Sequence, residues 1–299
     1  MMTRPVTLAR RALTRGELID WNELELDRPI TEEVEIAPEI AAAWLKNDED
    51  SEESFNRTAD IRRVERYARD MKNGDWWFTG APIVLDWHGH VRDGGHRLLA
   101  IVKSGETITF NVTYGVDPRA QHGMDRLRPR SVADDMKIAK LPNGAVIGSV
   151  ANLVLRWRSG KIFSSNWQPS DMEKLNLIDN EPHIHEAARH ALRISRNTPQ
   201  VAKSVLGTLW HEAHLLDADA TDAFFDQYFT GKIVDDDDAA ILAIRNTVIR
   251  YGSNGRRKPR QEYQLYQFVR AWNFWRQRRQ VKYFLIPETL SSENFPGLR

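Results

Sequence analysis

The sequence of 299 residues contains no cysteine and no long apolar run. The lack of cysteine excludes disulfides, thiol nucleophiles and cysteine-ligated zinc, and it fits a reducing compartment. No apolar stretch approaches the roughly 20 residues that a membrane-spanning helix needs. The N-terminal arginines are not followed by the apolar region of a secretory signal. We therefore expect a soluble, cytoplasmic protein without a membrane segment.

The formal net charge at pH 7 is zero, because 42 Lys and Arg residues balance 42 Asp and Glu residues. A neutral total does not favour a protein that coats nucleic acid over its whole surface, but it leaves room for a local basic patch. Internal repeats and low-complexity segments are missing as well. Tryptophan, in contrast, is abundant, with 10 residues, which indicates large apolar contacts or stacking surfaces.

The chain is long enough for two cores. Residues 1–29 are expected to form a basic arm, because they have too few apolar side chains for a core. Residues 30–135 mix short strand and short helix patterns, whereas residues 145–299, after the turn signal Pro142-Asn143-Gly144, show almost only helical patterns. We therefore predict an α+β fold, with an α+β domain over 30–135 and a mainly helical domain over 145–299.

The clearest helix of the first domain follows Thr58 as its expected cap and ends at Asn73-Gly74. Its apolar face consists of Ile61, Val64, Tyr67, Ala68 and Met71. The other predicted elements are a helix over 39–45, strands over 82–85, from Val91 and over 107–114, a helix from Leu98 to near Gly105, and a helix from Ser131.

The second domain shows several helix signals. A capping box, Ser170 with Glu173, opens one helix. Thr198-Pro199 is expected to begin a helix that runs through Trp210, and the acids of 235–238 precede a helix over 239–249. The last helix is expected over 259–280, with one apolar face formed by Leu265, Phe268, Val269, Trp272 and Trp275.

One short motif is a candidate phosphate-binding site: Asp93-Gly94-Gly95-His96-Arg97, between a predicted strand and a predicted helix. Glycines let the backbone approach an anion, and a helix N-terminus offers unpaired N–H groups and a partial positive charge. Arg97 adds a bidentate donor for phosphate, His96 can donate a proton or hydrogen bond, and Asp93 can hold a metal ion or orient His96. The plain alternative is a tight turn with a buried histidine and a surface arginine, because short glycine motifs often match by chance.

Several blocks around this motif resemble, in the same order, the ParB/sulfiredoxin superfamily, and especially the ParB-like proteins of phages and bacteria that carry a DGQHR motif. The matching blocks are Asn56-Arg57, the helix end over 67–76, Pro82-Ile83, Asp93 to Leu98, Gly115 to Pro118, and the segment over 125–131. Six ordered blocks are more specific than any single motif.

The resemblance implies a nucleotide-binding fold. In this superfamily the equivalent strand–turn–helix binds nucleotide phosphates: ParB proteins bind and hydrolyse CTP while clamping DNA, sulfiredoxin uses ATP with a catalytic cysteine, a free serine kinase uses ADP, and some relatives are described as nucleases. The absence of cysteine excludes sulfiredoxin chemistry here. Two departures from the family pattern matter, because Gly95 replaces a glutamine that could touch the ligand and Leu127 replaces a common glycine.

The resemblance also implies roles for individual residues. Gly94, Gly95, His96 and Arg97 are expected to hold the phosphates, and Asp93 to position His96 or a Mg²⁺ ion. The expected catalytic residues are Asp93, His96 and Arg97. Further contacts to the nucleotide are expected from Asn56, Arg57, Arg128 and Arg130. The expected ligand is ATP or CTP, with or without Mg²⁺.

Two basic clusters are candidates for binding phosphate or DNA. Arg126, Arg128 and Arg130 near Asp125 form either a phosphate clamp or a solvated loop before a capped helix. The C-terminal segment Arg256–Lys282 interleaves basic and aromatic residues, a pattern that suits nucleic acid. Its aromatic residues fall at helical spacing, however, so we expect the tryptophans to belong to the core.

Four histidines and one acidic run are candidate metal ligands. His183, His185, His211 and His214 lack the HExxH spacing and cysteine partners, so we expect satisfied or exposed histidines rather than a metal site. The run Asp235–Asp238 could bind Mg²⁺ but is more typical of a solvated helix start.

The main hypothesis is an NTP-binding protein, an NTPase or a phosphotransferase, that acts on or near DNA. One alternative is a DNA-binding module with an inactive nucleotide pocket. Another is a metal-dependent nuclease that uses carboxylates such as Asp93 and Asp125. A third is a structural or inhibitory protein that binds another protein through tryptophan-rich helices. Fold resemblance alone does not choose among them, because one fold hosts many chemistries.

Overall fold

The computed structural model describes residues 29–49, 59–123, 142–232, 239–251 and 258–299. The chain forms two compact units, residues 1–129 and 130–299. Among the described residues, all strands lie in the first unit and helices occur in both. The mixed α and β composition expected from the sequence is therefore confirmed.

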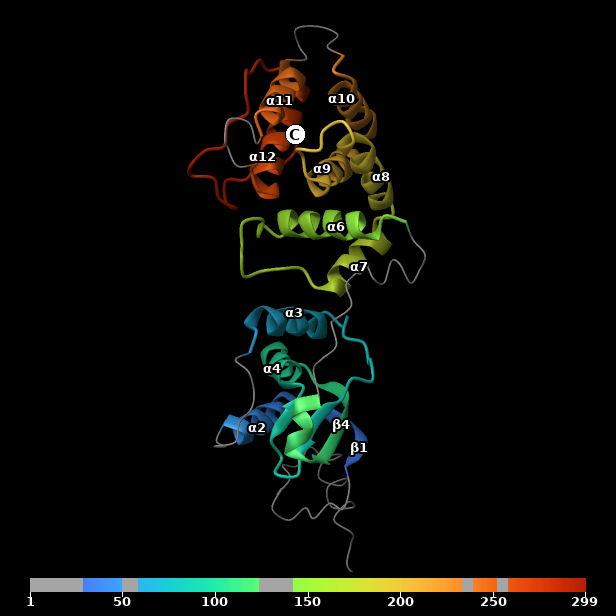
Figure 1. The fold of residues 1–299 in the computed structure, drawn as a ribbon, viewed down its shortest axis with the longest axis vertical. Coiled ribbons are helices and arrows are strands. Elements are labelled where there is room, and N and C mark those ends of the chain that lie inside the picture. Colours follow the sequence, from blue (N-terminus) through green and yellow to red (C-terminus); the bar gives the residue numbers. More distant parts are fainter. Residues whose placement is uncertain (1–28, 50–58, 124–141, 233–238, 252–257) are drawn as a thin grey trace, which may run out of the picture. The chain divides into compact units, whose positions relative to one another are not determined.

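A mixed four-stranded sheet is the framework of the first unit (Figure 1). Its strands are β1 (Ile30–Ile36), β2 (Ile83–Asp86), β3 (Val91–Asp93) and β4 (Ile108–Val116), in the order β1-β4-β2-β3. β4 pairs antiparallel with β1 and parallel with β2, and β2 pairs antiparallel with β3. A parallel pair needs a crossover connection, and helix α4 (Gly95–Ser104) lies in that connection.

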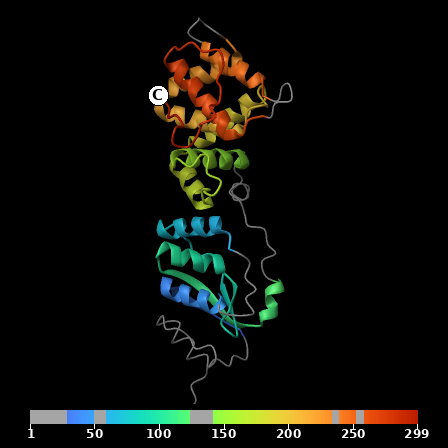
Figure 2. The same cartoon turned by 90° about the vertical axis from the view of Figure 1, so that its left-hand side faces the viewer.

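Three helices form a layer beside the sheet, with α4 in the middle (Figures 1 and 2). α2 (Pro38–Glu49) and α3 (Ile61–Lys72) both pack against α4, and a short 3₁₀ helix, η2 (Pro118–Gly123), follows β4. Large side chains fill the core of this unit: Trp44, Met71, Leu98, Phe110 and Tyr114. This packing fixes the N-terminal end of α4, which carries the DGGHR motif.

β1 is absent from the predicted elements. Three glutamates within seven residues obscure its alternation, although Val34 and Ile36 are buried while Glu33 and Glu35 are exposed. That period of two is the ordinary signal of a half-buried strand. It extends the sheet beyond the elements that the sequence indicated.

Most of the apolar face predicted for this helix is buried in α3. Val64, Ala68 and Met71 are buried, whereas Ile61 is exposed. The expected cap is wrong: the helix begins one residue after Asp60, whose side chain accepts the N–H of Arg62 at 3.0 Å. Thr58 itself lies outside the described residues.

The second unit is helical in its described part, as predicted. Its helices are α6 (Gly144–Arg158), α7 (Asp171–Asn180), α8 (Ile184–Ser195), α9 (Lys203–Leu216), α10 (Ala218–Thr230), α11 (Ala239–Ile249) and α12 (Gln261–Arg276). α9 is central, because it contacts α6, α8, α10 and α12. Most of its residues are buried, as expected for a helix that is apolar around most of its circumference.

Two helix boundaries of this unit differ from the prediction. The helix expected to begin at Thr198-Pro199 begins at Lys203 instead, and Thr198 closes α8 by donating its hydroxyl to the Ile194 carbonyl at 3.0 Å. The last helix ends at Arg276 rather than near 280. The capping box of Ser170 and Glu173 is confirmed at the start of α7, as is the helix over 239–249.

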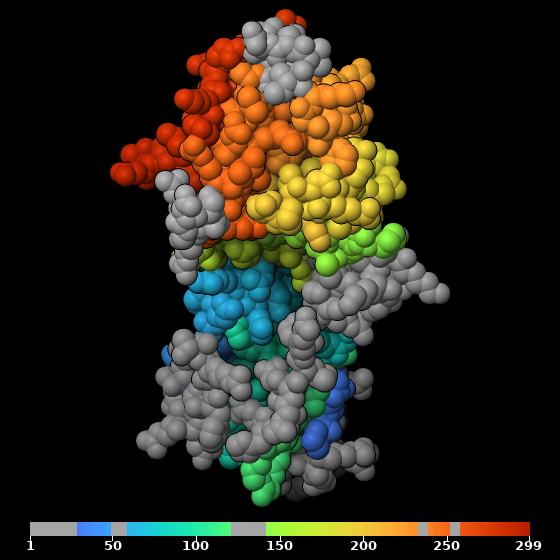
Figure 3. Space-filling model, turned by 45° about the horizontal axis from the view of Figure 1, so that its top comes forward, coloured from blue at the N-terminus to red at the C-terminus, as the bar shows by residue number. Residues whose placement is uncertain are grey.

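The segment after α12 packs back onto the helical unit. Phe284 is buried with its ring 5.5 Å from that of Phe274, and the Asn273 amide donates to the Gly297 carbonyl at 2.9 Å. Figure 3 shows this segment in red on the outside of the orange helices. Trp272 is fully buried and Trp275 partly, so the expectation that these tryptophans belong to the core is confirmed. No helix of the described ranges is long and apolar enough to cross a membrane.

Candidate functional site

A hairpin leads the chain into the DGGHR motif. One carboxylate oxygen of Asp86 accepts the N–H groups of His88 and His90 at 2.8 and 2.9 Å. The other accepts Nε–H of Arg92 at 2.7 Å, and the Asp86 and Arg92 side chains are both fully buried. Losing either partner of a buried ion pair would leave the other charge buried and uncompensated, which costs free energy. The Asp86–Arg92 pair therefore fixes the hairpin, and with it the position of Asp93 at the start of the motif.

Gly94 is the residue that makes the turn between β3 and α4. Its φ is +99°, in the left-handed region that side chains rarely adopt, and a Cβ at this position would lie 2.5 Å from Cδ1 of Ile83. A Cβ on Gly95, in contrast, would meet none of the described atoms within 4 Å. Gly94 is therefore required by the backbone, whereas Gly95 leaves open space at the first residue of α4.

Asp93 and Arg97 form a local ion pair across the turn. Asp93 Oδ1 accepts the N–H of Gly94 at 2.6 Å, and Asp93 Oδ2 lies 3.1 Å from Nη2 of Arg97. Both side chains are partly exposed, Asp93 more than Arg97. The sequence placed both residues at this site, and the structure adds that they contact one another.

His96 connects the motif to α3. Its Nε2 accepts the backbone N–H of Asp60, the residue before α3, at 3.0 Å. An acceptor Nε2 implies that a neutral ring carries its proton on Nδ1. His96 thus ties the first turns of α3 and α4 together.

The other expected nucleotide contacts, Asn56, Arg57, Arg128 and Arg130, lie outside the described residues, as does Asp125. The arrangement of the first unit therefore brings Asp93, Gly94, Gly95, His96 and Arg97 together at the N-terminal end of α4.

The basic C-terminal segment is only partly available to a ligand. Arg276 forms an ion pair with Asp217, and the Arg279 guanidinium lies 4.4 Å from the ring centroid of Phe274. Lys258, Arg260 and Lys282 are exposed, whereas Arg256 and Arg257 lie outside the described residues.

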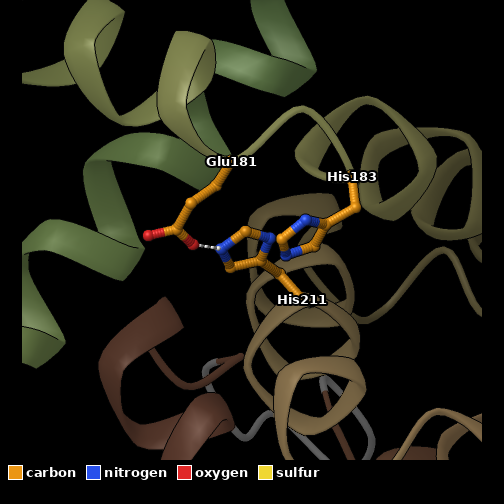
Figure 4. Close-up of side chains that lie close together, drawn as sticks. All are labelled: Glu181, His183 and His211. Atoms are coloured by element: carbon orange, nitrogen blue, oxygen red, sulfur yellow. Dashed lines mark hydrogen bonds and ion pairs between the residues drawn. The ribbon is translucent and has the colours of Figure 1, made fainter.

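A second polar cluster lies in the helical unit, where α7 gives way to α8 (Figure 4). Glu181, His183 and His211 each offer a ligating atom within 4.8 Å of the others. Nε2–H of His211, on α9, donates to Oε2 of Glu181 at 2.8 Å, and the His183 and His211 rings stack at 4.5 Å with an interplanar angle of 12°. The chain thus brings together side chains that lie about thirty positions apart in the sequence.

Arg158 holds the acidic side of this cluster. It donates to both oxygens of Glu181, at 2.6 and 2.9 Å, and its Nε donates to Glu212 at 2.9 Å. These hydrogen bonds lower the pKa of Glu181 and raise that of Arg158, whereas burial raises the pKa of Glu212. Burial also lowers the pKa of His211 to about 4, so the ring is neutral near pH 7.

Stacked rings extend from this cluster along the α8–α9 interface. His183 lies 5.9 Å from His214, His214 stacks on Trp210 at 4.4 Å, and Trp210 stacks on His190 at 4.7 Å. The atoms Nδ1 of His214 and His190 and Nε1 of Trp210 are buried without a hydrogen-bond partner among the described residues. The rings of His190, Trp210 and His214 therefore serve mainly as packing between the two helices.

Sequence reasoning had named His183, His185, His211 and His214 but not Glu181 or Arg158. His183 and His211 meet, while His185 and His214 are not part of the three-residue group. Glu181 follows α7 directly and stands two residues before His183. That E-x-H spacing at a helix junction is the signal that could have included it.

No protein family, curated protein or solved structure matches this chain.

Proposed function

We propose that this chain is a ParB/sulfiredoxin-like nucleotide-binding protein that holds the phosphates of ATP or CTP at the N-terminal end of α4. The observation that carries the proposal is the turn at Asp93–Arg97, where left-handed Gly94 ends strand β3 and α4 starts at the next residue. The first N–H groups of a helix lack intrahelical partners and attract anions. The open space over Gly95 lets a phosphate approach the backbone closely.

Arg97 supplies the charge of the proposed site. Its guanidinium already contacts Asp93 at 3.1 Å, and a phosphate is a second, doubly charged acceptor for the same donors. In this proposal the nucleotide competes with Asp93 for Arg97. The Asp93 carboxylate released in this way is an oxygen ligand of the type that Mg²⁺ prefers.

The geometry supports binding more directly than hydrolysis. His96 Nε2 accepts the Asp60 N–H, so in this arrangement it is not placed to accept a proton from a nucleophile. Turnover as an NTPase or phosphotransferase on or near DNA, with Asp93, His96 and Arg97 as catalytic residues, is the further part of the proposal and rests on the family resemblance.

A second candidate is a DNA-binding module whose nucleotide pocket is inactive. The observation that favours it is the Asp93–Arg97 ion pair, which satisfies the arginine without a ligand. This candidate predicts DNA binding with a steep salt dependence and no effect of nucleotide.

Thermal unfolding of the full chain tests the proposal. ATP, CTP, GTP and ADP are added with and without Mg²⁺ to the wild type, to Arg97→Ala and to Arg119→Ala. Arg119 is the matched control, because it is an exposed arginine of the same unit that is also paired with a nearby aspartate. A ligand that binds only the folded state raises the melting temperature.

The proposal predicts a rise with one nucleotide that disappears in Arg97→Ala and persists in Arg119→Ala. No shift with any nucleotide, or an equal shift in all three proteins, would overturn it. If no nucleotide shifts the melting temperature, DNA binding measured at several salt concentrations tests the second candidate.

A further inference from the structure

The strongest unassigned cluster in the described part of the chain is Glu181, His183 and His211, in the helical unit. Two imidazoles and one carboxylate are the ligand set of many three-ligand zinc sites. Their ligating atoms already lie within 4.8 Å of one another. From these observations we propose that the cluster binds one divalent transition-metal ion, of which Zn²⁺ is the best-suited probe.

Unsatisfied nitrogen atoms are the first argument for this site. Nε2 of His183 and Nδ1 of His211 are buried and have no hydrogen-bond partner among the described residues. A buried polar atom without a partner costs free energy, so such atoms call for an explanation. Metal coordination by the two rings and by Glu181 explains why these histidines are placed together.

Charge is the second argument. Arg158 carries one positive charge and pairs with two carboxylates, Glu181 and Glu212. With both histidine rings neutral, the group retains one negative charge, and the His211 side chain is 0% exposed. A dication therefore enters a partly buried site that is negative before it binds.

Arg158 also suits the role of an outer-shell partner. It donates a hydrogen bond to each oxygen of Glu181 and so fixes the orientation of the carboxylate. Groups that hydrogen-bond to metal ligands in this way orient them and tune affinity. His211 is neutral with its proton on Nε2, so Nδ1 can bind the metal while Nε2–H keeps its hydrogen bond to Glu181, and binding releases no proton from this ring.

Binding requires a small rearrangement of one ring. The His183 and His211 rings are nearly parallel, with an interplanar angle of 12°, and a metal lies close to the plane of each imidazole that binds it. His183 is the ring expected to turn. It stands in the turn before α8, and its Nε2 gives up no hydrogen bond to any described residue when it moves. Ligand atoms on tetrahedral zinc lie about 3.3 Å apart, so the approach needed is short.

Zinc binding by the full chain is the test. After treatment with a chelator, the protein is titrated with Zn²⁺ against a chromophoric chelator, and with Co²⁺ while the visible absorption spectrum is recorded. The variants are His183→Ala, Glu181→Gln and the control His185→Ala, which changes a partly exposed histidine two residues away and outside the group. Circular dichroism establishes that each variant is folded.

The proposal predicts one Zn²⁺ per wild-type chain and Co²⁺ absorption typical of a four-coordinate site. It predicts a loss of affinity of tenfold or more in both His183→Ala and Glu181→Gln, at least the loss expected when an outer-shell partner is removed, and wild-type affinity in His185→Ala. Absence of stoichiometric zinc binding by the wild type would overturn it. So would unchanged affinity in folded His183→Ala, because the histidines are then packing residues only. Neither result bears on the nucleotide site, which lies in the other unit.

Discussion

The two polar sites of this protein are built in opposite ways. The turn at Asp93–Arg97 is local: its ion pair, its glycine and its helix start lie within five consecutive residues, and its charged groups are partly exposed. The cluster of Glu181, His183 and His211 is assembled from a helix junction and a distant helix, and its histidine nitrogens are buried. The first site can be identified from the sequence because its residues are consecutive. The second site forms only when separate helices pack together.

The difference also concerns what each site lacks. In the turn the charges of Asp93 and Arg97 compensate one another, so an incoming phosphate must compete with a carboxylate. In the cluster one arginine meets two carboxylates, and two imidazole nitrogens have no partner among the described residues. The first arrangement suits reversible exchange of an anion, and the second suits a cation.

The largest expected effect separates the two adjacent glycines of the turn. Gly94→Ala forces a side chain into the left-handed region and against Ile83, so we expect a loss of about 2–4 kcal/mol in the unfolding free energy of the first unit. Gly95→Ala has open space and an ordinary helical position, so we expect no loss and a gain of up to about 1 kcal/mol. Urea denaturation measures both. Equal losses in the two variants would show that the turn is not held as described.

Arg158 tests the cluster of the helical unit. Arg158→Met leaves Glu181 and Glu212 without their shared partner, so we expect a loss of about 2 kcal/mol in unfolding free energy, less than for a fully buried pair because the arginine is partly exposed. The matched control is Arg189→Met, which removes an exposed pair with Glu186 and is expected to change stability by less than about 0.5 kcal/mol. Similar results for the two variants would contradict the account of the cluster.

The capping box of α7 tests how firmly Glu181 is positioned, because Glu181 caps the other end of this helix. Ser170→Ala removes the hydroxyl that accepts the Glu173 N–H at 3.0 Å, so we expect a loss of about 1 kcal/mol. Ser165→Ala, at an exposed serine that caps no helix, is the control and should leave the urea midpoint nearly unchanged. An unaffected midpoint in Ser170→Ala would mean that the box does not anchor α7.

The smallest expected effect concerns an exposed pair in the first unit. Hydrogen bonds from Arg119 lower the pKa of Asp117 to about 2, from an ordinary value of 3.8. A lowered carboxyl pKa stabilises the fold above pH 3.8, and this small contribution disappears as the pH falls toward 2. An NMR titration of the Asp117 carboxyl should show the low value in the wild type and a higher value in Arg119→Ala, still below 3.8 because the backbone N–H of residue 119 continues to donate to Asp117. An ordinary value in the wild type would show that the pair does not persist in solution.

The sequence located some of the helices and strands but not others. Periodicity located α3 and β4, an apolar run and the turn that follows it located β2 and β3, and the spacing of Ser170 and Glu173 identified the start of α7. It failed for β1, because glutamates occupy both faces of that strand, and for the start of α9, because Thr198 bonds backward to α8 instead of opening a new helix.

The candidate sites show the same limit. Residues 93–97 could be named from the sequence because turn, glycine and helix start are consecutive. The Asp93–Arg97 contact and the bond from Asp60 to His96 could not, since the first depends on the side-chain conformations at the turn and the second on how α3 packs on α4. Glu181 was missed because its partner His211 arrives from another helix.

The most direct test of the central claim is an NMR titration that follows the backbone amides of Gly94, Gly95 and His96 as ATP or CTP is added to the ¹⁵N-labelled protein. Phosphate bound at the start of α4 should shift these amide signals saturably, with the largest changes at Gly95 and His96, and Arg97→Ala should abolish the shifts. The chemical shifts of backbone amides in the helical unit should not change. If the amides of Gly95 and His96 do not move at saturating nucleotide, the turn does not bind phosphate and the account is contradicted.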